Sequence, residues 1–449
     1  ITREDGTEAF FISPAEFDLP FHFWRTLNDQ QYAGKVDVTI PLGGSSANKL
    51  QVGGFYSDKT RAFRDNVYQV QLGYSERYNG DPDLFFDNNN VGIIDFDENT
   101  ERRLIGLYPI NFLKSTRENS YDGSETISAA YAMTVYDWDV IKIIAGARAE
   151  KTDIFVASQD TTLETGAIDQ LDFLPSANVI VKLTDNMNIR VTGTQTIARP
   201  NMRELAPFVS FDFGGDFRIQ GNPNLQRTLV QNADLRWEMF PKPGEIIAAS
   251  VYYKNFKNPI VTAFVPEAAN PLIRYINVDR AQVYGLELEL RKNLAFIGPA
   301  FENFKFSTNL SLIQSVVDIS QAEQDIIADF NPEKGTTRPF QGQSPYLINA
   351  SLNYVDVEKG WDAIVSFNVF GERLSNISEG RTPDIYEQPR PQLDFSVSKS
   401  LTENFGIRLR ANNILNPATR TLMRFNGEEY NIQEFNRGAS FGISLSYKI

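Results

Sequence analysis

The chain has 449 residues, of which 42% are hydrophobic and 22% are charged, and its formal net charge is −14. A negative balance of this size excludes nucleic acid as a partner, because phosphates require a basic surface. The absence of cysteine excludes disulfides and thiolate metal sites, and the single histidine, His22, excludes multi-histidine metal sites. No run of about eighteen apolar residues occurs, so no transmembrane helix is predicted.

Strands of alternating apolar and polar residues are predicted along the whole chain, because a β-strand sends successive side chains to opposite faces. The pattern gives roughly fifteen strands, with ends placed to within about two to four residues. In chain order they lie near residues 35–41, 48–74, 128–136, 141–150, 176–183, 188–196, 232–239, 246–254, 282–291, 304–313, 348–354, 363–370, 392–398, 407–412 and 440–449. Nothing indicates a domain boundary, so residues 1–449 are predicted to form a single all-β domain.

The clearest strand runs from Gln282 to Arg291 and separates large apolar residues from glycine and charged residues. The two faces are Tyr284, Leu286, Leu288 and Leu290 against Gly285, Glu287, Glu289 and Arg291. Charged side chains facing lipid would cost roughly 2–4 kcal/mol each near the membrane midplane, whereas facing water they cost little. The recurring polar face is therefore predicted to line a wet interior, and the apolar face to meet hydrocarbon.

Very short and very long connections alternate between these strands. The short ones are predicted at residues 43–46, 137–139, 184–186, 241–244, 357–360 and 401–404. The long ones are predicted at residues 76–125, 158–170, 199–227, 258–273, 318–338, 375–388 and 417–433. Outer-membrane barrels show this alternation, with short periplasmic turns and long extracellular loops. A soluble β-sandwich, the alternative, has no reason to sort its loops in this way.

An ordered series of short segments resembles the barrel of TonB-dependent outer-membrane receptors. It runs Ile-Ala-Arg-Pro-Asn at 197–201, Gly-Asn-Pro-Asn-Leu at 221–225, Asn-Ala-Asp-Leu-Arg-Trp-Glu at 232–238, Tyr-Tyr-Lys at 252–254, Gly-Leu-Glu-Leu-Glu at 285–289 and Asn-Asn-Ile-Leu-Asn at 412–416. Each segment is weakly specific alone, and the order makes the series specific. The likeness covers residues 120–449.

This resemblance implies a 22-stranded transmembrane antiparallel β-barrel in the bacterial outer membrane, filled by an N-terminal plug domain. It also implies that the inner-membrane TonB complex drives uptake through a segment of the plug. Because roughly fifteen strands are predicted and no plug precedes them, the chain is expected to be the C-terminal part, roughly two-thirds, of such a barrel, with Ile1 in mid-protein. Ile449 departs from the family, whose members typically end in an aromatic residue.

Two sets of candidate functional residues follow. Charged residues of the polar face are predicted to line the lumen, keep it wet and pair with plug or substrate: Arg148, Glu150, Arg236, Glu238, Glu287, Glu289, Arg291, Arg408 and Arg410. Residues of the connection after strand 188–196 are candidates for substrate contact: Arg199, Arg203, Glu204, Phe208, Phe211 and Phe213. The structural alternative is that Pro200 ends the strand and that the phenylalanines form an interfacial girdle or pack within the loop.

The loop at 81–101 is rich in carboxylate and amide oxygens, which calcium prefers as ligands. Its spacing does not follow the EF-hand, and the interleaved phenylalanines and isoleucines predict a folded, solvated acidic loop. Whether it binds calcium stays open at this point. No metal site and no cofactor are predicted.

No nucleophile-elbow, zinc-protease, phosphate-loop or dinucleotide motif is present, so the chain is not predicted to be an enzyme. It is predicted to be an active transporter that binds a scarce, large nutrient at extracellular loops and imports it to the periplasm. The nutrient could be an iron chelate, a glycan or a peptide. Expected partners are the TonB complex, outer-membrane lipid and, in the SusC-like branch of the family, a surface lipoprotein lid. The alternatives are a barrel that anchors a larger surface assembly and a soluble secreted β-rich protein.

Overall fold

The computed structural model describes residues 21–43, 45–72, 81–98, 101–111, 113–211, 217–266, 271–329, 335–378 and 381–448. Within these ranges antiparallel strands predominate and form a large sheet, a smaller sheet built from the long connections, and a separate hairpin. No helix in the described part of the chain is both long and apolar enough to cross a membrane.

The large sheet contains 17 strands, of which β5 (Leu107–Asn111) and β18 (Thr337–Arg338) are short additions. The remaining fifteen strands, 17 less these two, form a wall in which each strand is antiparallel to the next, which agrees with the predicted number. They are β1 (Phe21–Leu42), β2 (Ser45–Leu72), β6 (Tyr121–Asp137), β7 (Ile141–Ser158), β8 (Gly166–Thr184), β9 (Met187–Ala198), β12 (Thr228–Met239), β13 (Ile246–Lys257), β16 (Arg280–Asn293), β17 (Phe304–Asp318), β19 (Tyr346–Asp356), β20 (Trp361–Phe370), β23 (Gln392–Ser400), β24 (Phe405–Asn412) and β27 (Ser440–Tyr447).

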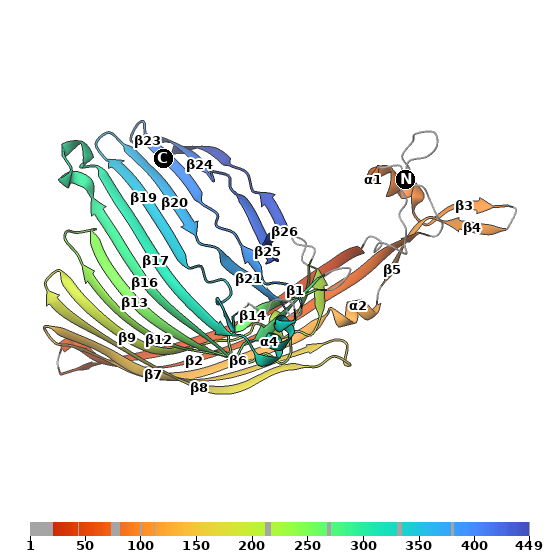
Figure 1. Cartoon of the computed structure of the whole chain (residues 1–449), viewed down its shortest axis with the longest axis horizontal. Coiled ribbons are helices and arrows are strands. Elements are labelled where there is room, and N and C mark those ends of the chain that lie inside the picture. Colours follow the sequence, from red (N-terminus) through yellow and green to blue (C-terminus); the bar gives the residue numbers. More distant parts are fainter. Residues whose placement is uncertain are drawn as a thin grey trace.

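The wall is one strongly curved sheet rather than two stacked layers (Figure 1). The all-β, barrel-type fold predicted from the alternation is therefore confirmed, and the sandwich alternative is wrong. In the described residues β1 pairs only with β2, and β27 pairs only with β24, so these two strands are the open edges of the wall.

The short and long connections lie at opposite ends of the wall. The short ones are residues 43–44, 138–140, 185–186, 240–245, 294–303, 357–360 and 401–404. The connection 294–303, which the sequence pattern missed, contains the 3-10 helices η2 (Leu294–Phe296) and η3 (Pro299–Phe301). The predicted long loop 158–170 is wrong, because β7 and β8 continue pairing up to Val156 opposite Gly166 and leave only residues 159–165 between them.

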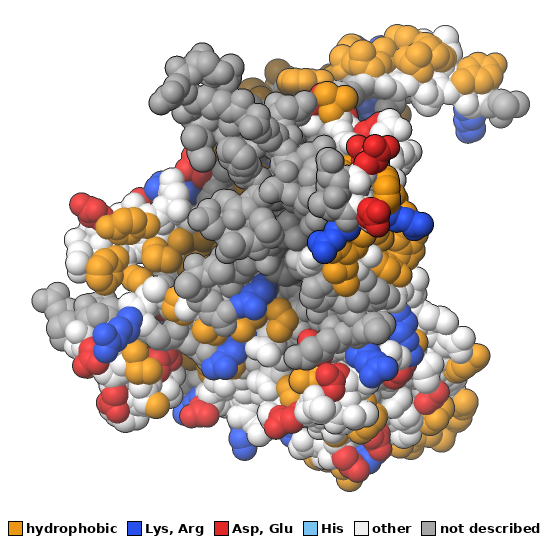
Figure 2. All heavy atoms as spheres, turned by 90° about the vertical axis from the view of Figure 1, so that its right-hand side faces the viewer, with side chains coloured by type: hydrophobic (Ala, Val, Ile, Leu, Met, Phe, Trp, Pro, Cys, Tyr) orange, Lys and Arg blue, Asp and Glu red, His pale blue; other side chains and the backbone are white. Residues whose placement is uncertain are grey.

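Four of the long connections join to form a second sheet. Its strands are β10 (Val209–Phe211), β11 (Arg218–Gln220), β15 (Leu272–Asn277), β14 (Ile260–Val265), β21 (Arg373–Ser378), β22 (Ile385–Glu387), β25 (Ala418–Phe425) and β26 (Glu428–Asn436). Two parallel pairings, β11 with β15 and β14 with β21, connect segments from different loops. Seen from this end, the described surface mixes hydrophobic, acidic and basic side chains (Figure 2).

The remaining elements are short. The connection between β2 and β6 contains α1 (Pro82–Phe85), η1 (Asn88–Asn90), the hairpin β3 (Ile93–Asp97) and β4 (Arg102–Ile105), and α2 (Leu113–Glu118). The helix α3 (Met202–Leu205) follows β9, and α4 (Gln321–Ala328) follows β17. The segments at β14 and α4 lie within the curve of the wall (Figure 1).

The strand register assigns apolar and polar side chains to opposite faces of the wall. Leu286 and Leu288 remain 36% and 42% exposed although they are large and apolar. The face that carries Glu287 is instead covered near the loop end, where Ile154 and Val156 of β7 pack against Leu205 of α3 and are at most 1% exposed. The loops therefore fold onto the polar face, and the apolar face is the one left open.

Placing a cation on the open face should destabilise the barrel. We expect Leu288→Arg to lower the stability of the barrel in lipid by about 2–4 kcal/mol, because an arginine near the membrane midplane loses its hydration. Reversible unfolding in lipid vesicles, followed by heat-dependent gel mobility, measures this loss.

The matched control is Ser311→Arg, one strand away on the opposite face and directly across from Glu287. Ser311→Arg should lower the stability of the barrel much less than Leu288→Arg, because its side chain faces water. Equal losses in the two variants would contradict the assignment of the faces.

Candidate functional site

An ion network crosses the polar face toward the short-turn end of β9, β12, β13 and β16. The Arg236 guanidinium donates to Glu238 at 3.0 Å, to the Ser250 hydroxyl at 3.1 Å and to Glu289 at 2.8 Å. Arg190 donates to the other oxygen of Glu238 at 3.2 Å. Because Arg236 lies opposite both Arg190 and Ser250 in the register, the pleat alone brings these groups onto one face. We call this set the inner network.

A second network lies toward the loop end, on β7 and the residue that follows β9. Arg148 pairs with Glu150 at 2.5 Å, and Arg199 pairs with the same carboxylate and donates to the Thr152 hydroxyl at 2.7 Å. Glu150 is 6% exposed, so both cations compensate a buried charge. Arg199 was predicted as a substrate contact and Arg148 and Glu150 as wall residues, and the structure joins all three in one network.

Beside this second network lies a further buried ion pair that the sequence reasoning missed. Arg227 pairs with Asp172 at 2.6 Å, and Asp172 is only 4% exposed. Asp172 precedes the predicted strand 176–183, and the true β8 begins earlier, at Gly166. Reading the alternation further toward the N-terminus of this strand would have placed Asp172 on the polar face.

The other predicted wall residues share the same face by register. Glu287 lies across from Ser250 and Ser311, and Arg291 is four positions further along the same strand. Arg408 and Arg410 lie across from Ser398 and Ser396, in the row of small polar residues that continues to β27. That these residues line a path for substrate stays a prediction.

Between β16 and β23 the polar face forms a groove of about 490 Å³, whose lining is mainly amide and hydroxyl side chains with Glu289, Arg291 and Asp394 among them. Asn349 donates to Asn309 at 2.6 Å, and Asn368 donates to Asn349 at 2.5 Å, which makes an amide ladder across three strands. On β23 Gln392 donates to Asp394 at 3.0 Å. Amide and carboxylate oxygens, together with amide N–H groups, give this groove donors and acceptors for a hydroxyl-rich or peptide-like surface.

A cavity of about 350 Å³ lies at the loop end of the wall, where Arg199, Glu204 and Tyr275 are among its lining residues. Burial raises the pKa of the Glu204 carboxyl above its usual value, and burial likewise raises the pKa of Tyr275. The Glu204 carboxylate accepts a bond from the Asn201 backbone N–H at 2.9 Å in a capping box that begins α3. Two of the predicted loop residues thus border one cavity, and Glu204 also holds a helix terminus.

Arg203 and Phe208 stabilise the loop from within. Arg203 stacks on the Phe208 ring at 3.9 Å and donates to the Ser210 hydroxyl at 2.7 Å and the Ile219 carbonyl at 2.9 Å. Burial lowers the pKa of its guanidinium. Phe208 is 2% exposed and stacks on Phe63 and Tyr121. This residue therefore packs inside the protein, as the structural alternative predicted.

The side chain of Phe211 and the whole of Phe213 lie outside the described residues. Substrate contact by the predicted loop residues stays a prediction.

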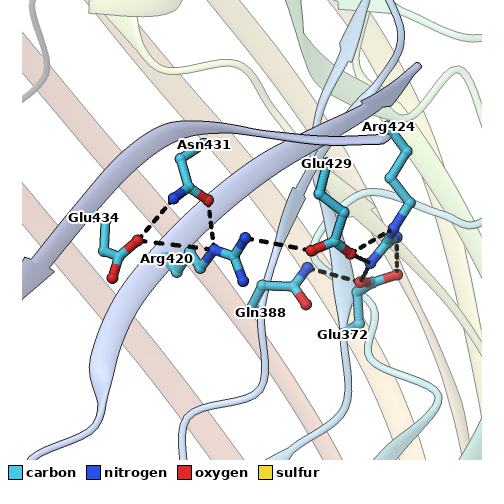
Figure 3. A network of polar contacts seen from close by, with 7 residues as sticks. All are labelled: Glu372, Gln388, Arg420, Arg424, Glu429, Asn431 and Glu434. Carbon is cyan, nitrogen blue, oxygen red and sulfur yellow. Dashed lines mark hydrogen bonds and ion pairs between the residues drawn. The ribbon is translucent and has the colours of Figure 1, made fainter. Parts of the chain in front are cut away.

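A network of charged and amide side chains joins the β25–β26 hairpin to the ends of the wall strands (Figure 3). Arg424 donates to Glu372, which follows β20, at 2.9 and 2.6 Å, and to Glu429 at 3.1 Å. Gln388 donates to the same Glu372 carboxylate at 2.7 Å. The hydrogen bond from Arg424 holds the pKa of Glu372 below its usual value of 4.5.

The same network continues along the hairpin itself. Arg420 of β25 donates to Asn431 at 2.5 Å and to Glu429 at 3.3 Å, and Asn431 donates to Glu434 at 2.8 Å. Arg420 and Arg424 therefore fasten β26 to β25, while Glu372 and Gln388 fasten the pair to the wall (Figure 3).

The acidic loop is folded, as predicted. Asp87 caps η1 by accepting from the Asn89 backbone N–H at 2.8 Å, and Asp95 accepts from the Phe96 backbone N–H at 2.8 Å. Among the residues that the structure describes, no three His, Cys, Asp or Glu side chains are grouped so as to hold a metal ion.

Comparisons with known proteins concern the fold of this wall. The model of a family described as "Outer membrane protein beta-barrel family" matches residues 107–447. No curated protein matches the chain significantly.

Several solved structures share the fold. The siderophore receptor PiuA from Acinetobacter baumannii has a TM-score of 0.60 at 11% identity, over 94% of this chain and 56% of that one. The ferric yersiniabactin uptake receptor FyuA from Yersinia pestis has a TM-score of 0.58 at 13% identity, over 95% of this chain and 55% of that one. The ferric citrate transporter FecA has a TM-score of 0.59 at 11% identity, over 98% of this chain and 57% of that one. The chain thus spans little more than half the length of these proteins, and at these identities the likeness is one of fold.

The inner network predicts a specific pattern of stabilities. Arg236→Ala should destabilise the folded wall by about 2 kcal/mol, because Glu238 and Glu289 lose a shared partner while Glu238 stays 5% exposed. The double variant Arg236→Ala/Glu238→Gln should recover part of the lost stability, because glutamine leaves no unpaired buried charge. Urea unfolding of the two single variants and the double variant measures the coupling, and strictly additive losses would contradict it.

The hairpin network predicts a pH dependence. Because the pKa of Glu372 is lowered in the folded state, its ion pair stabilises the hairpin at neutral pH, and this contribution is lost as the pH falls below 4.5 through the lowered value. Protection factors from amide hydrogen exchange over residues 418–436 should fall in that range. At neutral pH, Glu372→Gln should lower them as well, while Glu403→Gln, in a turn at the opposite end, should leave them unchanged.

Proposed function

The chain belongs to the outer membrane protein beta-barrel family and resides in the outer membrane, and on this basis we propose that it forms a large part of the wall of a TonB-dependent transporter. The transporter binds a scarce, large nutrient at its extracellular loops and releases it into the periplasm. No chemical step is involved. The observation that carries the proposal is the polar face, which recurs on most of the fifteen wall strands and, among the described residues, is covered by loops at one end.

The wall must be completed by further strands in the membrane. β1 and β27 each leave one row of backbone N–H and C=O groups without a strand partner among the described residues. In hydrocarbon each unsatisfied group costs several kcal/mol, so only a closed barrel is stable there. We therefore place these strands next to additional barrel strands, in line with the 22 strands that the resemblance implies.

Polar wall residues hold water in the lumen and offer partners to a plug and to a passing substrate. In the inner network, Arg236 and Glu289 lie in a half-exposed position, with 26% and 33% of their side chains accessible. They can exchange their present contacts for contacts to a plug without a large desolvation cost, because they remain hydrated. Glu287, Arg291, Arg408 and Arg410 lie on the same face and extend this surface.

An iron chelate is the first substrate class to test. The solved structures that share the fold include a siderophore receptor and a ferric citrate transporter. A glycan or peptide is the second class, and the amide-lined groove at Asn309, Asn349 and Asn368 supports it. For that class, a surface lipoprotein lid would be a partner in addition to the TonB complex.

Uptake measurements test the transporter directly. A strain lacking the gene should lose TonB-dependent uptake of one nutrient from a panel of labelled iron chelates and oligosaccharides, and the full-length gene should restore it. Deleting the TonB gene should abolish the same uptake. A barrel that only anchors a surface assembly would leave uptake of every nutrient in the panel unchanged in both strains.

A further inference from the structure

The connection between β2 and β6 projects beyond the rest of the molecule (Figure 1). We call residues 81–98 and 101–111 of this connection the arm. It contains α1, η1 and the β3–β4 hairpin, and β5 joins it to β2. The backbone bonds from Gly92 to Leu107 and from Gly106 to Gly92, both 2.8 Å, extend the pairing of the hairpin at its base.

Six large apolar side chains on the arm are exposed to between 43% and 59%: Leu84, Phe86, Val91, Ile93, Phe96 and Ile105. On the hairpin three of them share one face. Ile93 lies directly across from Ile105, and a register shift after Ile93 puts Phe96, across from Arg103, on that same side. A two-stranded hairpin is marginally stable alone in water, and in the described part of the chain its apolar face stays exposed, so this face requires a covering layer.

The lipid bilayer does not provide this cover. The strand β2 has 28 residues, and a membrane-spanning strand needs only about ten. Counted from the short turn at 43–44, the last dozen or so residues of β2 therefore continue past the membrane for roughly 40 Å along the strand, at about 3.3 Å per residue. The arm follows the far end of β2, in the aqueous exterior.

The exposed area matches a protein interface in size. Six side chains of about 200 Å² each, half exposed, present on the order of 600 Å² of apolar surface over the arm, about half of it on the shared hairpin face. The shared face alone reaches the lower end of the largest patches found on ordinary monomers, roughly 300–600 Å², and the whole arm approaches the roughly 800 Å² that each partner contributes to a standard interface.

Charge selects the kind of partner. Residues 81–111 contain seven carboxylates and two arginines, a net charge of −5. A second copy of this chain, with a net charge of −14, would bring like charges together. Anionic phosphates at a lipid or lipopolysaccharide surface would be repelled for the same reason.

From the exposed apolar face, its place outside the membrane and its acidic rim, we propose that the arm is the docking surface for a second, different protein at the cell surface. That protein has an apolar contact area bordered by lysine and arginine. The docking is independent of which nutrient is transported, so it stands or fails separately from the transport proposal.

Native mass spectrometry of the full protein, purified in mild detergent from its own cells, tests the proposal. The expected result is a one-to-one complex with another protein whose sequence, read from the same sample, carries a basic surface segment. In the variant Ile93→Asp/Phe96→Asp the bound fraction should fall about tenfold or more, because apolar anchors dominate interface energies. In Asp95→Lys/Glu98→Lys it should fall as well, through loss of electrostatic complementarity.

The matched control is Val357→Asp, an 86% exposed apolar residue in a short turn at the opposite end of the wall, which should leave the complex intact. Heat-dependent gel mobility confirms that every variant is folded. The proposal is overturned if the wild-type protein carries only its own mass, forms a complex with a second copy of itself, or holds an acidic partner. It is equally overturned if a partner stays bound to both arm variants.

Discussion

Every backbone N–H and C=O group of a membrane-spanning segment needs a partner within the protein, and this constraint determines the rest of the structure. In hydrocarbon no water replaces a missing hydrogen bond. The fifteen wall strands satisfy it by pairing with both neighbours, and only β1 and β27 retain an unpaired edge among the described residues. Because such a sheet is locked in register, its side chains have only two directions, toward lipid or toward the interior.

Charge then collects on one face as a consequence of the pleat. Arg236 reaches Glu238 within its own strand and Glu289 two strands away, since all three project to the same side. At the loop end the same face is covered by loops, and there the carboxylates of Glu150 and Asp172 pair with Arg199 and Arg227, which belong to a long connection. The wall thus carries a network of its own strand residues toward the short turns, and a core packed against loop residues at the other end. The loop sheet and the hairpin network of Figure 3 hold the loop end in a defined arrangement.

The period-two pattern was sufficient to predict the strands, their faces and the sorting of short and long connections, because these depend on neighbours along the chain. Contacts between loops left no such signal. Ala263 pairs in parallel with Ile377, more than a hundred residues away, through strands too short for alternation to be read. The joining of Arg199 to Glu150 is also a long-range contact. Residues 166–170 were misjudged as part of the loop because Gly166, Asp169 and Gln170 resemble loop residues, although they belong to β8.

The central claim is that the Leu288 face meets hydrocarbon and the Glu287 face meets water. The chain has no native cysteine, so single cysteines can be introduced without background. Reaction of Glu287→Cys and Leu288→Cys with a membrane-impermeant maleimide, in barrels reconstituted into lipid vesicles, reports the medium around each position. The account predicts modification at position 287 and protection at position 288. Modification at 288 with protection at 287 would contradict it.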